Sequence, residues 1–144
     1  MEIRQLTEDF YVAPQLSPED MAALAEAGIR TVICNRPDGE VPPSHSAATM
    51  QAAAEAAGLD FHSVPLTHQS FTPDNIARQR GIATGSDGAC LAYCASGTRS
   101  CFAWAMGAVE DHNLSDVIEI AARAGYDLGP IQPLLSSLMA ARGE

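Results

Sequence analysis

One short segment, residues 91–100, carries the residue types that could do chemistry. An apolar run ends at Cys94, Arg99 follows five positions later, and Gly97 lies between them. A stretch with helical character begins directly afterwards. The backbone amides of such a loop, and the N-terminus of the helix behind it, would point at the sulfur and favour its thiolate form. The segment therefore predicts thiolate chemistry on an anionic group.

The other residues of the loop are small or carry hydroxyl groups. Gly97 allows the tight backbone that aims successive N–H groups inward. Arg99 adds a fixed cation whose forked donors fit an oxyanion. We expect Ser100 to hydrogen-bond the thiolate or a leaving sulfur. The predicted site pairs the catalytic residues Cys94 and Arg99 with an anion-binding loop of Ala95, Ser96, Gly97, Thr98 and Ser100.

The elements that must position this loop alternate between short apolar runs and helical segments. Strands are predicted at 10–13, 29–34, 61–66 and 89–93, and helices at 17–28, 46–57, from 72 onward, 100–109, 114–124 and 131–141. Ser17 is the expected N-cap of the first helix, with Pro18 as its first residue. The alternation predicts an α/β fold with a central, mainly parallel sheet flanked by helices. Cys94 and the loop 35–40 both follow strand ends, where such sheets bind ligands.

Length, charge and hydropathy exclude several classes of function. The 144 residues, 47% of them hydrophobic, predict a single catalytic domain over 1–144. Eighteen acidic against eight basic residues give a net charge of −10, so neither nucleic acid nor a membrane surface is an expected partner. No window approaches the ~18 apolar residues of a membrane span. The N-terminus lacks the order of a signal peptide, so we expect a cytoplasmic protein.

The four cysteines are not arranged as a metal site. Cys90, Cys94 and Cys101 have the spacing C-x3-C-x6-C, which is no zinc pattern, and neither a metal nor a cofactor is expected. A disulfide framework is not expected in the cytoplasm. Cys90 and Cys101 are predicted to lie in the core. Cys34 ends its strand and is either another buried residue or a resolving thiol near Cys94.

Three further residues, Arg36, Asp38 and His68, are predicted at the rim of the site. Arg36 would attract an anionic donor such as thiosulfate or glutathione persulfide. The alternative is that Arg36 and Asp38 only stabilise a turn through local hydrogen bonds and an ion pair. His68 follows a strand end, where it would line the site or act as an acid, unless it is a plain surface residue. Trp104 is expected in the core or in a pocket wall.

Several motifs resemble one known family. They are VAPQLSPED at 12–20, NRPDGE at 35–40, the alanine-rich 54–58, Val64-Pro65, and SGTRS at 96–100. Together they are similar to the phosphatase-like domain of beta-lactamase-hydrolase-like proteins, within the protein tyrosine phosphatase superfamily. The loop also resembles that of rhodaneses. The resemblance implies a dual-specificity-phosphatase-like α/β fold, with Cys94 as nucleophile and Arg99 as anion-binding residue. Members of the family are labelled phosphatase-like or sulfurtransferase.

Three departures from the phosphatase pattern favour sulfur transfer over phosphate hydrolysis. Four residues, not five, separate Cys94 from Arg99, which makes a smaller cradle. Tyr93 stands where phosphatases usually have histidine. The segment 61–69 contains no carboxylate to protonate a leaving group, and Asp74 is expected only as a first-turn helix residue. Thiolates need no such acid because they leave readily near neutral pH.

The leading prediction is therefore a sulfurtransferase that passes sulfane sulfur through a Cys94 persulfide. It would take sulfur from a small-molecule donor and give it to a thiol acceptor. The alternative is a phosphohydrolase that acts on a phosphate ester through a phosphocysteine intermediate. A third interpretation is a non-catalytic sensor of anions or persulfides.

Overall fold

The computed structural model describes residues 2–142. The strands are β1 (Arg4–Thr7), β2 (Phe10–Ala13), β3 (Ile29–Cys34), β4 (Asp60–Ser63) and β5 (Ala89–Tyr93). The α-helices are α1 (Asp20–Glu26), α2 (Ala47–Ala56), α3 (Pro73–Thr84), α4 (Thr98–Ala108), α5 (Leu114–Arg123) and α6 (Gln132–Arg142). Short 3-10 helices are η1 (Asp38–Glu40), η2 (Pro43–His45) and η3 (Gly129–Ile131).

The five strands form one sheet in the order β1-β2-β5-β3-β4. β1 is antiparallel to β2, and the other neighbours run parallel. β5 lies in the centre, and its residues from Cys90 to Tyr93 are buried. A continuous apolar run is what a strand covered on both faces requires. The reactive segment thus leaves the sheet at the carboxyl end of its central strand.

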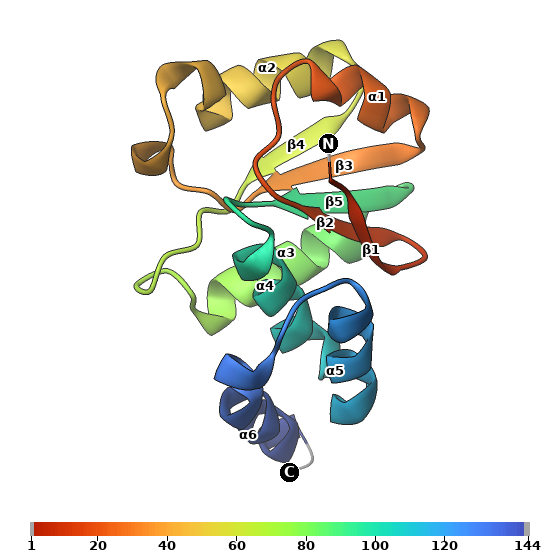
Figure 1. Ribbon diagram of the computed structural model, residues 1–144, viewed down its shortest axis with the longest axis vertical. Helices are drawn as coiled ribbons and strands as arrows, with labels where there is room; N and C mark the ends of the chain where they lie inside the picture. Colours follow the sequence, from red (N-terminus) through yellow and green to blue (C-terminus); the bar gives the residue numbers. More distant parts are fainter. Residues whose placement is uncertain (1, 143–144) are drawn as a thin grey trace.

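Helices cover both faces of the sheet (Figure 1), which confirms the predicted α/β class. α1 and α2 lie on one face, where their core includes Met21, Leu24 and Met50. α3 and α4 lie on the other face, and α5 and α6 pack against α4 on the side away from the sheet. The core on that side includes Val117 and Leu135 from the two C-terminal helices.

The helix capping signals were only partly predictive. Thr72 caps α3 as its sequence predicts, since its hydroxyl accepts the Asn75 N–H at 3.3 Å and Pro73 is the first helical residue. The helix predicted at 17–28 is present as α1, but its predicted start is wrong: the helix begins at Asp20, three residues after Ser17. Asp20 instead accepts the Ser17 N–H at 2.8 Å, which stabilises a turn ahead of the helix.

Two sheet features also differ from the sequence prediction. β1 was not expected, because residues 4–7 are mostly polar; as an edge strand it is half solvated. β4 ends at Ser63. The extended chain continues from there, because the N–H groups of Val64 and Leu66 still donate to the carbonyls of Cys34 and Asn35, each at 2.9 Å.

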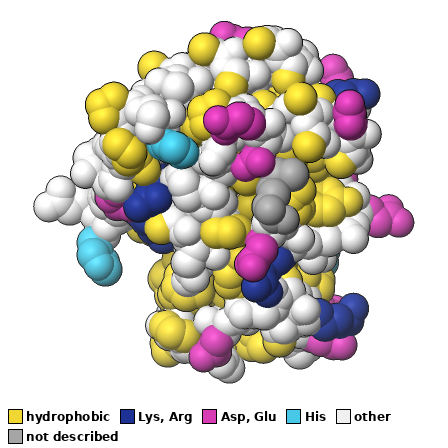
Figure 2. Space-filling model, turned by 45° about the horizontal axis from the view of Figure 1, so that its top comes forward, with side chains coloured by type: hydrophobic (Ala, Val, Ile, Leu, Met, Phe, Trp, Pro, Cys, Tyr) yellow, Lys and Arg dark blue, Asp and Glu magenta, His cyan; other side chains and the backbone are white. Residues whose placement is uncertain are grey.

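The surface carries the negative charge of the composition. On the face shown in Figure 2, acidic side chains are scattered widely and basic side chains gather in a few places. Within the part of the chain that the structure describes, no helix is both long enough and apolar enough to cross a membrane.

Candidate functional site

Cys94 lies where β5 passes into the loop that leads to α4 (Figure 1). Its backbone N–H donates to the Ala13 carbonyl at 3.3 Å, and its side chain is almost fully buried. The Gly97 N–H donates to the Cys94 Sγ at 3.1 Å. That amide and the N-terminus of the 11-residue helix α4 both favour negative charge on the sulfur.

Gly97 is the N-cap of α4 and adopts the left-handed conformation, with φ of +94°. Residues with a Cβ rarely adopt this φ. A Cβ at this position would also collide with the hydroxyl of Tyr126 and lie 3.4 Å from the carbonyl carbon of Ala13. Two features therefore require glycine at position 97: the backbone conformation and the close approach of Tyr126.

The outer carbonyls of the loop are held by donors from distant segments. Ala95 O accepts the Gln15 N–H at 3.2 Å, and Ser96 O accepts the Tyr126 hydroxyl at 3.2 Å. The Ser96 hydroxyl donates to the Thr98 hydroxyl at 2.9 Å. Of the loop N–H groups, that of Gly97 points to the Cys94 Sγ, and that of Thr98 donates to the Ser96 hydroxyl at 3.4 Å. The anion-binding role of the loop stays a prediction.

Arg99 extends from the first turn of α4 to two acceptors. Its Nη1 and Nη2 donate to the two carboxylate oxygens of Glu40 at 2.9 and 2.7 Å, and Nη1 also donates to Leu66 O at 3.0 Å. Hydrogen bonds from Arg99 hold the pKa of Glu40 below its ordinary value, and the same carboxylate raises the pKa of Arg99. Glu40 is thus an ionised acceptor at the site.

Arg36 and Asp38 make local contacts, as the turn-stabilising alternative expects, and their role at the rim of the site stays a prediction. Arg36 braces Glu40, through Nε to Oε1 at 3.3 Å and through Nη2 to the Glu40 carbonyl at 3.1 Å. Its Nη1 donates to the Gln15 Oε1 at 3.2 Å. Asp38 instead accepts the Ala47 N–H at 2.8 Å, at the start of α2. The 3-10 turn η1 brings Glu40, not Asp38, back to Arg36.

Ser100 does not hydrogen-bond the sulfur, and that prediction is also corrected. It is fully buried, and its hydroxyl donates to the Asn35 Oδ1 at 2.8 Å. The Asn35 Nδ2 donates to the Gln79 Oε1 at 2.6 Å and to the Val64 carbonyl at 2.9 Å, and the Gln79 Nε2 returns a bond to Asn35 at 3.3 Å. The Asn35 Oδ1, buried behind the loop, is thus the acceptor for the Ser100 hydroxyl in place of the Cys94 sulfur.

The other cysteines are less suited to react. Cys90 and Cys101 are core residues as predicted, and burial raises the pKa of each to about 12. Burial likewise raises the pKa of Cys34, whose S–H donates to the Arg36 carbonyl at 3.4 Å. The Tyr93 hydroxyl is buried beside the Cys34 thiol. Burial raises the pKa of Tyr93, and the nearby Cys34 adds to this effect.

The predicted role of His68 stays a prediction. It is exposed in the turn after β4 and makes no hydrogen bond or ion pair to another described residue. The same turn reaches the site at Leu66, whose carbonyl binds Arg99.

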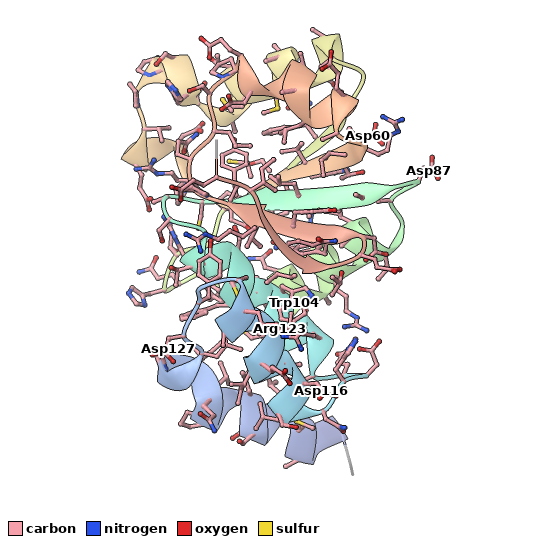
Figure 3. All side chains as sticks on the ribbon, turned by 45° about the vertical axis from the view of Figure 1, so that its right-hand side comes forward. Asp60, Asp87, Trp104, Asp116, Arg123 and Asp127 are labelled. Carbon is pink, nitrogen blue, oxygen red and sulfur yellow. The ribbon has the colours of Figure 1, made fainter. Side chains whose placement is uncertain are left out.

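Trp104 lies on α4, away from the Cys94 loop (Figure 3). It lines a cavity of about 250 Å³ together with Phe10, Ala108 and Asp111, which confirms a pocket-wall position. Gln79 also lines this cavity, so the buried amide pair of Asn35 and Gln79 connects it to the back of the loop.

Sequence reasoning missed five residues that complete the site: Gln15, Asn35, Glu40, Gln79 and Tyr126. Asn35 and Glu40 stand inside a motif that sequence reasoning had singled out, but the motif gave no reason to select them over Arg36 and Asp38. Tyr126 lies 30 residues from its acceptor, and no local pattern connects the two.

A central parallel strand that leads into a cysteine loop, one amide that donates to the sulfur, and an arginine in the next helical turn are the arrangement of a phosphatase-like domain. The chain belongs to the family described as "Beta-lactamase hydrolase-like protein, phosphatase-like domain", whose model matches residues 2–111.

Similar proteins agree with this assignment. A beta-lactamase hydrolase-like protein of Xylella fastidiosa (strain Temecula1) is 37% identical over 132 residues, which cover 90% of this chain and 30% of the relative. A homologue from Agrobacterium fabrum is 28% identical over 130 residues, again 30% of its length. The chain therefore spans less than a third of these curated relatives.

Solved structures show the same fold. A protein of Neisseria meningitidis Z2491, assigned provisionally as a phosphatase, is 32% identical with a TM-score of 0.84, over 96% of this chain and 99% of that one. TpbA of P. aeruginosa, solved with phosphotyrosine, has a TM-score of 0.65 at 15% identity, over 99% and 90% of the two chains. These findings support the phosphatase-like part of the prediction, while sulfur transfer remains a prediction.

Proposed function

We propose that this chain hydrolyses phosphate monoesters, with Cys94 as the nucleophile. The observation that carries the proposal is the Cys94 sulfur, which accepts the Gly97 N–H at 3.1 Å at the head of α4, with Arg99 in the first helical turn. A thiolate held in this way faces the place where loop amides and a guanidinium would bind a tetrahedral anion.

In the first step the thiolate attacks phosphorus. The S–P bond forms, the P–O bond to the leaving group breaks, and the departing oxygen takes a proton from solvent water. In the second step water attacks phosphorus, the S–P bond breaks, and inorganic phosphate leaves with Cys94 restored as the thiolate. The loop amides and Arg99 stabilise the charge on the phosphoryl oxygens in both steps.

How readily the leaving group departs decides which phosphate esters can be substrates. Asp74 lies in the first turn of α3, and Glu40 is kept ionised by Arg99, so neither is a ready proton donor. General acid catalysis is typically worth ~10²–10⁴-fold in rate, and without it only good leaving groups depart quickly. Aryl phosphates such as phosphotyrosine fit this requirement, and the complex of the structural neighbour TpbA with phosphotyrosine supports the choice.

The second candidate is transfer of sulfane sulfur. Two observations favour it: only four residues separate Cys94 from Arg99, and the segment 61–69 holds no carboxylate. The thiolate would attack the sulfane sulfur of thiosulfate, release sulfite, and form a Cys94 persulfide. A thiol or cyanide would then remove the outer sulfur. In the third interpretation the chain is a non-catalytic sensor of anions or persulfides, in which the Cys94 thiolate turns over no substrate.

One set of assays separates these functions. Hydrolysis of p-nitrophenyl phosphate and of a phosphotyrosine peptide is measured beside thiosulfate:cyanide transfer, for wild type, Cys94→Ser and Cys34→Ser. Cys34→Ser is the matched control, because it changes a buried sulfur outside the loop. We expect phosphate release by wild type and the control but not by Cys94→Ser. Cyanide-dependent transfer without phosphate release would support the second candidate, and activity that survives Cys94→Ser would exclude both.

A further inference from the structure

A single peptide group joins the side chains of Cys94 and Tyr126, which come from different segments of the chain. The peptide between Ser96 and Gly97 accepts the Tyr126 hydroxyl at its carbonyl, at 3.2 Å, and donates its N–H to the Cys94 Sγ at 3.1 Å. The C=O and N–H of a trans peptide point in opposite directions. Tyr126 and Cys94 therefore sit at the two ends of one peptide dipole.

We propose that Tyr126 is a positioning residue that acts on the Cys94 thiolate through the Ser96–Gly97 peptide. Its hydroxyl fixes the plane of that peptide, so the N–H stays aimed at the sulfur. Its bond to the carbonyl also polarises the peptide, which strengthens the N–H as a donor. The inference rests on the proposed role of Cys94 as nucleophile.

Tyr126 is itself held in place. The Arg4 guanidinium lies over its ring, 5.6 Å from the ring centre, and also donates to the Ala124 carbonyl at 2.6 Å. The Tyr126 N–H donates to the Ala121 carbonyl at 2.9 Å. Burial raises the pKa of Tyr126, so the phenol keeps the proton that it donates.

The position of Tyr126 in the chain separates it from the other residues that contact the Cys94 loop. It lies in the connection between α5 and η3, next to the labelled Asp127, and this connection runs beside α4 (Figure 3). The family model matches residues 2–111 and so does not include it. The connection between α5 and η3 thus supplies a contact to the loop from outside the matched region.

The test compares Tyr126→Phe with wild type and with Tyr11→Phe, which removes a hydroxyl from β2 instead. The readout is the rate of Cys94 alkylation by iodoacetamide as a function of pH, beside kcat and KM for p-nitrophenyl phosphate. Loss of one hydrogen bond should lower the alkylation rate at neutral pH about three- to tenfold and move the pH midpoint upward. kcat should fall more than KM changes.

A purely structural tyrosine would give another result. Tyr126→Phe keeps the ring under Arg4, so an unchanged alkylation profile in this variant would overturn the inference. Tyr126→Ala, which removes the ring as well, should lower the melting temperature in addition. If wild type turns over no phosphate ester but Tyr126→Phe still shifts the alkylation profile, the proposed function fails and the positioning role stands.

Discussion

Arg99 and Glu40 meet in a two-pronged pair, with Nη1 and Nη2 of the guanidinium 2.9 and 2.7 Å from the two carboxylate oxygens. The residue expected to recognise a substrate anion thus already holds an internal one. Arg36 Nε donates to one of the same oxygens, the Glu40 Oε1, at 3.3 Å. A phosphoryl group that enters the loop has either to share Arg99 with Glu40 or to displace Glu40 from Arg99.

The first prediction concerns this competition. Glu40→Gln keeps the size of the side chain but removes its charge, so Arg99 should be freer to bind a dianion. We expect inorganic phosphate to bind about tenfold more tightly, equivalent to ~1.4 kcal/mol. Isothermal titration of phosphate into wild type, Glu40→Gln and the control Glu55→Gln measures this. Weaker binding in Glu40→Gln would mean that Glu40 orients Arg99 for the anion instead of competing with it.

The second prediction is a pH dependence of stability. The pKa of Glu40 is lower in the folded protein than its ordinary value of 4.5, chiefly because of the hydrogen bond from Arg99. The pair therefore stabilises the fold above pH 4.5, and this stabilisation is lost as the pH falls through the lower, folded value. The carboxylate is 38% exposed, so the contribution is at most ~1 kcal/mol.

Urea unfolding at pH 7 and at pH 3 checks this prediction. The free energy of unfolding of Glu40→Gln should lie below that of wild type at pH 7, and the gap should be smaller at pH 3. A gap of equal size at both pH values would show that the charge of Glu40 contributes nothing to stability.

The third prediction concerns Gly97→Ala. An alanine would carry the strain of a positive φ, roughly 1–2 kcal/mol, and its Cβ would push Tyr126 from the loop. We expect a clear loss of stability and of Cys94 reactivity. In the background of Tyr126→Phe, where the colliding hydroxyl is absent, the same substitution should cost less. Equal costs in both backgrounds would show that Tyr126 does not constrain Gly97.

The fourth prediction tests the buried network behind the loop. Asn35→Ala leaves the Ser100 hydroxyl and the Gln79 amide without partners, and each unsatisfied buried group costs about 1–3 kcal/mol. Ser100→Ala leaves Asn35 bonded to Gln79 and should cost less. Thermal unfolding of the two variants ranks them, and the opposite order would contradict this account of the network.

The sequence predicted the parts of the molecule that depend on local pattern. The apolar run of β5 predicts a central strand, and Thr72-Pro73 predicts the start of α3, because both signals act within a few residues. The Cys94 loop was predicted for the same reason. Ser17-Pro18 placed the start of α1 three residues too early, because residues 17–20 form a turn, closed by the Asp20 N–H and the Ser17 carbonyl at 3.0 Å, that leads directly into the helix.

The partners of the loop could not be predicted, because each comes from a distant segment. Glu40 is 59 residues from Arg99, and Asn35 is 65 residues from Ser100. Their contacts depend on the order of strands, which places β3 beside β5. Nothing in residues 35–40 distinguishes Glu40, which binds Arg99, from Asp38, which binds the start of α2.

The bond from Tyr126 to the Ser96 carbonyl has a consequence for where the domain can be shortened. Residues 2–111 hold the five strands, Cys94 and Arg99, but the donor to the Ser96 carbonyl comes from residue 126. Domains generally fold as units. A fragment that stops at residue 111 therefore loses this hydrogen bond together with the packing of α5 and α6 on α4.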